Sequence, residues 1–307
     1  MASPPVVLDI DGAVGALPGA RVLRMADWQE RIRFGCGMRV YREFARVLAG
    51  ELPAAHGTVF LGSGDFHHLS YALIARLDPD RLIKVVVLDN HPDNMRFPFG
   101  IHCGSWVRRV AALPWVSHVD VLGITSGDVA AAHAWENYFT PLLRGKLTNW
   151  CVGVDVQWAK RLGLAARFLS FESVAELIDR FAEARRRDHI PTYLTIDKDV
   201  LSKGVVDTNW DQGVLVEADM LDIIGLLGGS LIGSDVTGDV STYRYRAKWK
   251  RWMSAMDHQP DVNGDELNKW QRTHHMLNLR LLGAIAACHS RQEKASSFDN
   301  TTYSRQP

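Results

Sequence analysis

The sequence contains only four cysteines among 307 residues, and their placement excludes two kinds of small stabilised domain. They show neither a CxxC pair nor zinc-finger spacing, and they are Cys36, Cys103, Cys151 and Cys288. Isolated thiols of this kind are typical of a reducing compartment and argue against a disulfide framework. The formal net charge is zero, so no global field draws the chain to nucleic acid or to an anionic membrane.

Long apolar runs and targeting signals are also missing. No run approaches the roughly 20 apolar residues that a membrane-spanning helix needs. Residues 1–9 have neither a basic region nor a long apolar stretch, which argues against a signal peptide. We therefore predict a cytoplasmic protein with no membrane or nucleic-acid partner. A basic and aromatic stretch at residues 243–252 could bind nucleic acid or an acidic peptide, but the zero net charge favours a subunit or substrate-entry surface.

Short apolar runs alternate with amphipathic segments along most of the chain. Runs of strand length occur at residues 6–10, 58–61, 84–88, 119–124, 151–156, 193–196 and 230–233. Between them, segments such as residues 38–48 repeat apolar residues at helical spacing. This alternation predicts an α/β fold of three layers, in which helices cover both faces of a mainly parallel central sheet.

No repeat or low-complexity linker divides the sequence. We expect one catalytic domain over residues 1–290, ending in a helix that Asp265 caps and that reaches about residue 289. The polar residues 291–307 are expected to form a disordered tail.

One stretch, residues 84–93, carries the clearest chemical signal. An apolar run there leads directly into Asp89, His91 and Asp93. Alternate side chains of an extended chain share a face, so these three can converge on one point. Pro92 cannot donate to a sheet ladder, so regular pairing should stop there. Open parallel sheets bind ligands beyond the carboxyl ends of their strands, and two carboxylates with an imidazole suit a divalent ion such as Mn²⁺ or Zn²⁺.

Two other predicted strands end in similar residues. The strand at 58–61 runs through a glycine turn into adjacent histidines, either of which could be a metal ligand, namely His67 and His68. The strand at 193–196 ends in Asp197 and Asp199, which share a face while Lys198 points to the other. Like charges so close need a cation or a raised pKa. The three strand ends together carry too many ligands for one tetrahedral zinc, and two ions roughly 3.5 Å apart that share Asp89 and Asp197 would use them.

In these motifs the sequence resembles the arginase/agmatinase (ureohydrolase) family, whose fold also underlies histone deacetylases. The family's Gly-Gly-Asp-His, Asp-Ala-His-x-Asp and Ser-x-Asp-x-Asp motifs are similar to residues 63–67, 89–93 and 195–199, and the resemblance covers residues 55–240. It implies two Mn²⁺ ions per chain. One set of ligands would be His67, Asp89, Asp93 and Asp197, and the other would be Asp89, His91, Asp197 and Asp199.

The resemblance also implies a reaction, the release of urea from a guanidino group. Two metals lower the pKa of a bound water toward about 7. Asp93 would orient the attacking hydroxide. His102, which precedes a glycine as the family's catalytic histidine does, would help protonate the departing amine.

Several departures from the family bear on the substrate. Gly238 stands where the family's guanidinium-binding Glu is expected, so we take Asp239, Asp235 and Asp211 as candidate substrate-binding carboxylates. The loop between Asp93 and His102 is shorter than in arginases and lacks, at the clamping positions, the Ser and Asn that hold the α-carboxylate of arginine. This predicts a peptide-bound arginine or another guanidino compound in place of free arginine.

Two other functions compete with this reading. One is a zinc-dependent deacylase of the deacetylase type, which would hold a single ion. The other is a non-catalytic relative that binds metal or a partner through the stretch at residues 243–252. Ureohydrolases are often trimers or hexamers, so a homo-oligomer is possible, although the motifs do not encode that contact.

Overall fold

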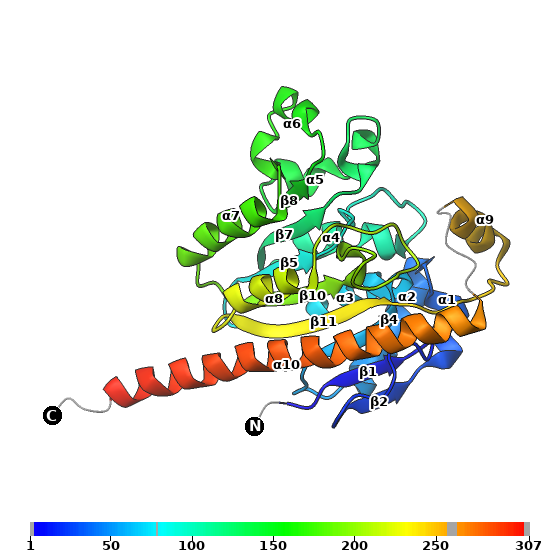
Figure 1. The fold of residues 1–307 in the computed structure, drawn as a ribbon, viewed down its shortest axis with the longest axis horizontal. Coiled ribbons are helices and arrows are strands. Elements are labelled where there is room, and N and C mark those ends of the chain that lie inside the picture. Colours follow the sequence, from blue (N-terminus) through cyan, green and yellow to red (C-terminus); the bar gives the residue numbers. More distant parts are fainter. Residues whose placement is uncertain (1–2, 78, 257–262, 304–307) are drawn as a thin grey trace.

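The computed structural model describes residues 3–77, 79–256 and 263–303 of the chain, and the predicted fold class is confirmed. Nine strands form one parallel sheet in the order β2-β1-β4-β11-β10-β5-β7-β8-β9 (Figure 1). The strands are β1 (Val6–Asp9), β2 (Arg21–Arg24), β4 (Val59–Ser63), β5 (Ile83–Leu88), β7 (Val116–Ile124), β8 (Leu147–Val152), β9 (Phe168–Phe171), β10 (Thr192–Asp197) and β11 (Leu231–Asp239). A separate antiparallel pair joins β3 (Gly35–Cys36) to β6 (Ile101–His102).

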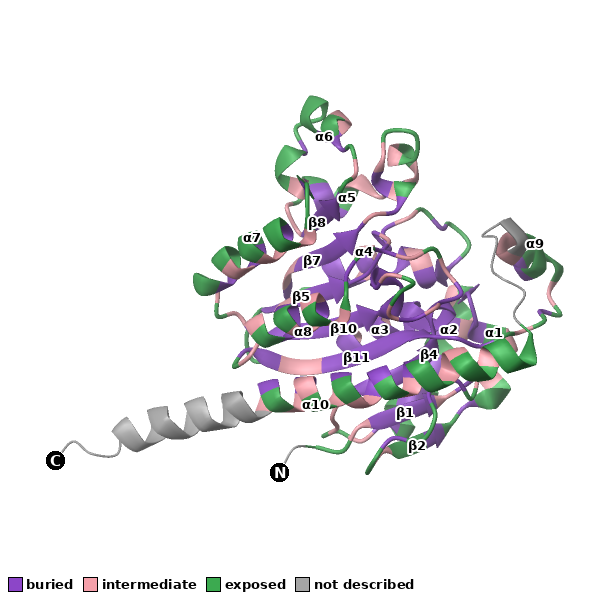
Figure 2. Cartoon of the chain, viewed as in Figure 1, coloured by how far each residue is buried: buried purple, intermediate pink, exposed green. Residues whose placement is uncertain are grey.

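Helices cover both faces of the sheet and bury a separate apolar core against each. On one face Phe44 and Val110 pack with the sheet, and on the other Phe181, Ile223 and Leu281 do so. The central strands are buried along most of their length (Figure 2). The helices are α1 (Gln29–Ile32), α2 (Met38–Glu51), α3 (Ser70–Ala75), α4 (Val107–Ala111), α5 (Phe139–Leu143), α6 (Gln157–Arg161), α7 (Val174–Arg186), α8 (Glu217–Leu226), α9 (Lys248–Met256) and α10 (Gly264–Tyr303).

Several element boundaries differ from the expectations. β2 was not predicted, because only one of its four side chains is buried and an edge strand needs no alternating pattern. β8 begins four residues before the expected strand at 151–156, and β11 continues to Asp239 beyond the expected end at residue 233. These shifts follow from pairing with neighbouring strands, which local sequence does not record.

The C-terminal helix was also predicted too short. α10 runs to Tyr303, beyond the expected helix end near residue 289. The disordered tail expected from residue 291 stays a prediction. Residues 304–307 lie outside the described residues. The cap is Asn263, whose side chain accepts the backbone N–H of Glu266, and not Asp265. Within the described ranges, none of the helices combines the length and apolarity that crossing a bilayer requires.

The parallel arrangement decides where the motifs meet. β4, β11, β10 and β5 are consecutive in the sheet, and all point the same way. Their carboxyl ends therefore lie along one edge. The 3-10 helix Gly64–Leu69 follows β4, and the 3-10 helix Lys198–Val200 follows β10, so both bring their side chains to that edge.

Candidate metal centre

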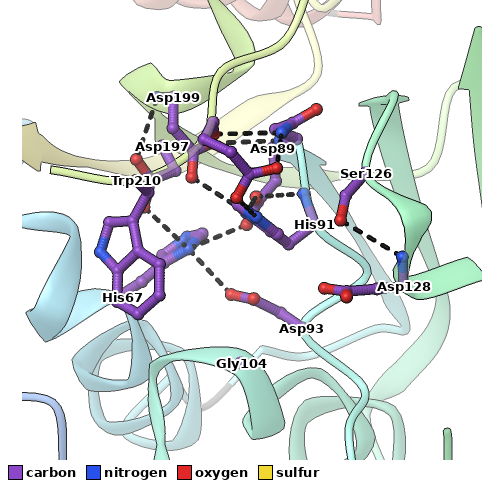
Figure 3. Close-up of polar contacts among 12 residues, drawn as sticks. His67, Asp89, His91, Asp93, Gly104, Ser126, Asp128, Asp197, Asp199 and Trp210 are labelled. Carbon is purple, nitrogen blue, oxygen red and sulfur yellow. Dashed lines mark hydrogen bonds and ion pairs between the residues drawn. The ribbon is translucent and has the colours of Figure 1, made fainter. Parts of the chain in front are cut away.

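Two groups of metal-competent side chains, all buried except the half-buried His91, meet at this edge (Figure 3). His67, Asp89 and Asp93 form one group, and Asp89, His91 and Asp199 form the other. Asp89 is common to both, with Oδ2 turned toward His67 and Oδ1 toward His91. A single carboxylate shared by two ligand sets is the arrangement that a two-ion site requires.

His67 points its Nδ1 atom at three carboxylates. Nδ1 lies 3.0 Å from Oδ2 of Asp93, 3.1 Å from Oδ2 of Asp89 and 3.5 Å from Oδ2 of Asp197. Its other nitrogen, Nε2, is 3.0 Å from Oγ1 of Thr195, and that hydroxyl donates to Asp235 at 2.6 Å. Because the Thr195 proton is committed to Asp235, Nε2 of His67 must donate, which leaves the Nδ1 lone pair free for a cation.

His68, the alternative ligand, does not take part in either group. It is fully buried, its ring lies 6.2 Å from the ring of Tyr41, and its backbone carbonyl accepts the Tyr41 hydroxyl. The structure therefore brings His67, and not His68, to the carboxylates.

His91 has the same two-sided environment as His67. Its Nδ1 lies 3.0 Å from Oδ2 of Asp199 and 3.5 Å from Oδ1 of Asp89, while Nε2 lies 2.7 Å from Oδ1 of Asp211. Asn90 holds Asp211 through a side-chain hydrogen bond of 3.1 Å. Since Asp211 can only accept when ionised, Nε2 carries the proton and Nδ1 again faces the candidate ion.

Trp106 fixes Asp93 in the first group, and the sequence analysis did not single it out. Its Nε1 donates to Oδ2 of Asp93 at 2.5 Å, and its ring packs 4.8 Å from the ring of His67. Asp93 has a φ of 45°, which a non-glycine residue rarely adopts. Strain at a ligand position is common at functional sites, where the surrounding structure maintains it.

Four buried carboxylates at the site need positive charge to neutralise them. Asp89, Asp93, Asp197 and Asp199 are each at most 5% exposed. Burial and the neighbouring Asp89 raise the pKa of Asp93 to about 7, and burial raises the pKa of Asp197 to about 6. Burial opposes a charge on His67 too, yet the neighbouring carboxylates of Asp89 and Asp93 raise its pKa well above the usual range.

The residues fit a pair of divalent cations. Among the described residues, Nδ1 of His67 and Oδ2 of Asp89 are buried and have no hydrogen-bond partner, although they lie 3.1 Å apart. Buried polar atoms are nearly always satisfied, so an orphaned imidazole nitrogen beside an orphaned carboxylate oxygen indicates a missing ligand. Imidazole and carboxylate donors suit Mn²⁺, Zn²⁺ and related ions.

His102 lies on the wall of the same pocket. Its Nδ1 accepts the backbone N–H of Gly104 at 2.9 Å, so the neutral ring carries its proton on Nε2. Burial lowers its pKa to about 4, which keeps the ring neutral at physiological pH. The ring is stacked at 6.0 Å on Phe34 and meets the edge of Phe97 at 4.4 Å.

Two of the three predicted substrate-binding carboxylates do not reach the pocket. Asp235 is fully buried, and its Oδ1 accepts from Thr195 and Ser70, so it orients His67 indirectly. Asp239 lies on the opposite face of the sheet, where it pairs with Lys198 at 2.7 Å. Neither residue lines the pocket, because Asp235 is committed to Thr195 and Ser70, and the register shift of β11 between Thr237 and Asp239 lets Asp239 face Lys198. Asp211, the third, does line the pocket.

The space around position 238 admits only a glycine. Its φ is 86°, and a Cβ there would lie 2.4 Å from Oδ1 of Asp197 and 2.6 Å from the backbone nitrogen of Lys198. Any side chain would push against a candidate metal ligand. The glycine is therefore a condition of the close packing behind Asp197.

The pocket above the site encloses about 330 Å³. Its apolar wall includes Phe34, Phe97, Trp210 and Trp252. Its polar residues beyond the candidate ligands and His102 include Arg96, Asp128 and Asp211. Asp128 was missed by the sequence analysis. The signal available was its place two residues after a capping Ser126 at the end of a predicted strand, which is weak when taken alone.

No protein-family model matches the chain. An uncharacterized protein of Thermotoga maritima is 26% identical over 200 residues, which are 65% of this chain and 63% of that protein, so the match spans less than two thirds of the relative's length. Three solved structures share the fold. A proclavaminate amidino hydrolase from Streptomyces clavuligerus has a TM-score of 0.54 and 16% sequence identity, over 94% of this chain and 93% of that one. A hypothetical agmatinase from Burkholderia thailandensis has a TM-score of 0.52 and 16% identity, over 95% of this chain and 87% of that one. The agmatine ureohydrolase of Thermoplasma volcanium has a TM-score of 0.52 and 14% identity, over 96% of this chain and 92% of that one.

Proposed function

On the premise that this chain has the arginase-like fold of amidino hydrolases and agmatinases, we propose that it is a binuclear-metal hydrolase that cleaves a guanidino C–N bond and releases urea. The observation that carries the proposal is the shared carboxylate of Asp89 between two His–Asp groups. We propose two Mn²⁺ ions per chain. The first would be held by His67, Asp89, Asp93 and Asp197. The second would be held by Asp89, His91, Asp197 and Asp199.

Divalent cations in such a site supply Lewis acidity and lower the pKa of a water molecule toward about 7. The guanidino group itself is planar and cationic, and the pocket offers matching surfaces. Phe34 and Trp210 form a stacked aromatic wall with ring centroids 6.1 Å apart. Asp128 and Asp211 add carboxylates that attract the cation.

Hydrolysis adds one water across the C–N bond and yields urea and an amine, so one proton must reach the departing nitrogen. Asp93, whose carboxylate is held in place by the hydrogen bond from Trp106, would orient the water, accept its proton and pass that proton to the departing nitrogen. His102 lines the pocket with its proton on Nε2, and it would donate a hydrogen bond to the leaving nitrogen. With a pKa of about 4 the ring acts as a neutral donor, which refines the acid role expected from the sequence.

The substrate that we propose is a guanidino compound other than free arginine, with peptide-bound arginine as one form. The support is the shortened loop between Asp93 and His102, which lacks the clamp that arginases use for the α-carboxylate. A pocket of about 330 Å³ accepts one guanidinoalkyl chain but not several residues of a peptide, so a peptide would insert only its arginine side chain.

The test is urea release by the full-length protein loaded with Mn²⁺. Agmatine, small guanidines, arginine-containing peptides and free arginine would be offered, with Asp197→Ala as the inactive control. Urea from at least one guanidine and none from the Asp197→Ala variant is the expected result. Absence of urea from every guanidine, with two ions bound per chain, would refute the proposed reaction.

Metal content separates this function from a single-zinc deacylase. A one-ion enzyme would not need the second group, in which Nδ1 of His91 lies 3.0 Å from Oδ2 of Asp199. Two ions per chain by elemental analysis are expected. One tightly held zinc would favour the deacylase.

A further inference from the structure

The helix α9 contributes to the pocket wall, yet little of it is buried. Trp252 and Met253 of α9 line the pocket. Trp252 is 65% exposed, and Met253 is half-buried. Among the α9 side chains that the structure describes, only that of Lys250 is fully buried, at 3% exposure. Surface helices are ordinarily held by an apolar face, so the attachment of α9 depends to an unusual degree on a charged group.

Lys250 binds the end of the neighbouring helix α1 (Figure 1). Its Nζ donates to the backbone carbonyls of Glu30 at 2.8 Å, Arg33 at 2.8 Å and Arg31 at 3.3 Å. The last carbonyls of a helix have no partner within that helix, and an ammonium has three N–H donors. Lys250 therefore gives a charge-assisted hydrogen bond to each of three backbone acceptors where α1 ends.

Glu30 makes the reciprocal contact with α9. Its two carboxylate oxygens accept the backbone N–H groups of Arg246 and Ala247, each at 3.1 Å, immediately before α9 begins. Burial opposes the charge of Glu30, yet these hydrogen bonds lower its pKa. Each helix thus supplies the charge that suits the end of the other: α1 gives a carboxylate to the start of α9, and α9 gives an ammonium to the end of α1.

The carbonyl of Arg33 connects Lys250 to a second part of the pocket wall. It also accepts the backbone N–H of Gly35 at 2.8 Å, which closes a three-residue turn around Phe34. Phe34 has a φ of 67°, and turns of this kind are rare and strained. The Phe34 ring lines the pocket and stacks on His102, with ring centroids 6.0 Å apart. Lys250 therefore supports the turn that presents Phe34 as well as the helix α9.

From these contacts we propose that Lys250 is a positioning residue: its ammonium holds α9 and the Phe34 turn together and thereby fixes the pocket wall that a substrate contacts. Lys250 does not line the pocket itself, so it acts through Phe34, Trp252 and Met253. The hold of Lys250 on α9 is independent of the reaction, whereas its effect on substrate binding rests on the proposed function. Without the ammonium, three backbone carbonyls lose a donor.

Hydrogen exchange of the full-length protein loaded with Mn²⁺ tests the hold on α9. Lys250→Met keeps an unbranched side chain and removes the ammonium. Lys146→Met is the matched control, because Nζ of Lys146 also donates to a backbone carbonyl, that of Val116 at 2.8 Å, and Lys146 does not line the pocket. In Lys250→Met the amides of residues 248–254 and 34–36 should lose protection by about 10-fold or more, as the loss of charge-assisted hydrogen bonds warrants. In Lys146→Met they should keep it.

Steady-state kinetics test the effect on the substrate. KM for the guanidino compounds that yield urea should rise by about 10-fold in Lys250→Met, because contacts with the wall are lost, while kcat changes by less than about twofold. Two Mn²⁺ ions should remain bound. Lys250→Arg, which keeps a cation with several donors, should restore part of the protection and part of the affinity. An unchanged KM, or the loss of a metal ion, would overturn the positioning role.

The outcomes separate this inference from the proposed function. If no guanidine yields urea, the proposed reaction fails, and hydrogen exchange still decides whether Lys250 holds α9. Unchanged protection in Lys250→Met, or an equal loss in Lys146→Met, refutes the inference. If far-UV circular dichroism shows that Lys250→Met does not fold, Glu30→Gln is measured in its place, because it weakens the other half of the contact. Protection at residues 248–254 should again fall, and unchanged protection there would count equally against the inference.

Discussion

Replacing Trp106 by Phe removes one hydrogen-bond donor from the candidate metal centre and keeps an aromatic ring in its place. Trp106 is fully buried, and its Nε1 donates to Oδ2 of Asp93 at 2.5 Å. Without that donor the Asp93 carboxylate loses a partner of its charged form. Its pKa, already raised to about 7 by burial and by Asp89, should rise further, and protons should compete more strongly with a cation.

The size of the effect follows from the kind of contact. Removing a hydrogen bond to a metal ligand costs about 10- to 100-fold in metal affinity. That factor is about 1.4–2.8 kcal/mol, which the folded protein loses as ligand-dependent stabilisation at saturating metal. For a chain of this size the metal-dependent gain in Tm should fall by about 2–4 °C.

Two measurements test this expectation. Isothermal titration with Mn²⁺ gives the affinity, and thermal unfolding with and without Mn²⁺ gives the stabilisation. Trp150→Phe is the matched control, because Trp150 is also buried and donates to a carboxylate, that of Asp120, at 2.9 Å but in a different part of the sheet. Both variants lose the same atoms, so their intrinsic losses of packing should be similar.

The reasoning is refuted if Trp106→Phe binds Mn²⁺ as tightly as the unmodified protein. It is equally refuted if Trp150→Phe weakens binding as much, since the loss would then come from general loosening of the fold. A variant that fails to fold is recognised by its far-UV circular dichroism, and Trp106→His, which retains a ring N–H, then provides the comparison.

Three further predictions concern the second ligand group, the packing behind the site and acid stability. Asp199→Ala should reduce bound Mn²⁺ from two ions to one per chain by elemental analysis, and retention of two would argue against the second group. Gly238→Ala should lower the free energy of unfolding by about 2–4 kcal/mol in urea, because a Cβ at a φ of 86° would lie 2.4 Å from Oδ1 of Asp197. Gly225→Ala is the control and should not destabilise the fold, because no atom lies within 4 Å of a Cβ at that position. His274 is buried with a pKa lowered to about 4, so the native state stays neutral while the unfolded state binds a proton below pH 6.5. Stability should therefore fall by about 3 kcal/mol as the pH drops from 6.5 to 4, and His274→Gln should flatten that fall in unfolding curves.

The sequence by itself determined the class of fold and the residue types of the site. Buried strands leave continuous apolar runs, and the period of two places Asp89, His91 and Asp93 together whatever the rest of the chain does. The same rule correctly predicted that Lys198 points away from the crevice, and on that opposite face it pairs with Asp239. These are local consequences of backbone geometry, so a single sequence suffices to predict them.

Only the tertiary structure decided which partners each side chain meets. His67 and His68 are adjacent in sequence, and the difference between them lies in Thr195 and Asp235, which arrive from strands more than 120 residues away. Trp106, Phe34 and Asp128 come to the site from separate segments of the chain, and no local sequence pattern predicts that they meet there. Side-chain contacts across a parallel sheet depend on register and strand order, and those are set by packing of the whole domain.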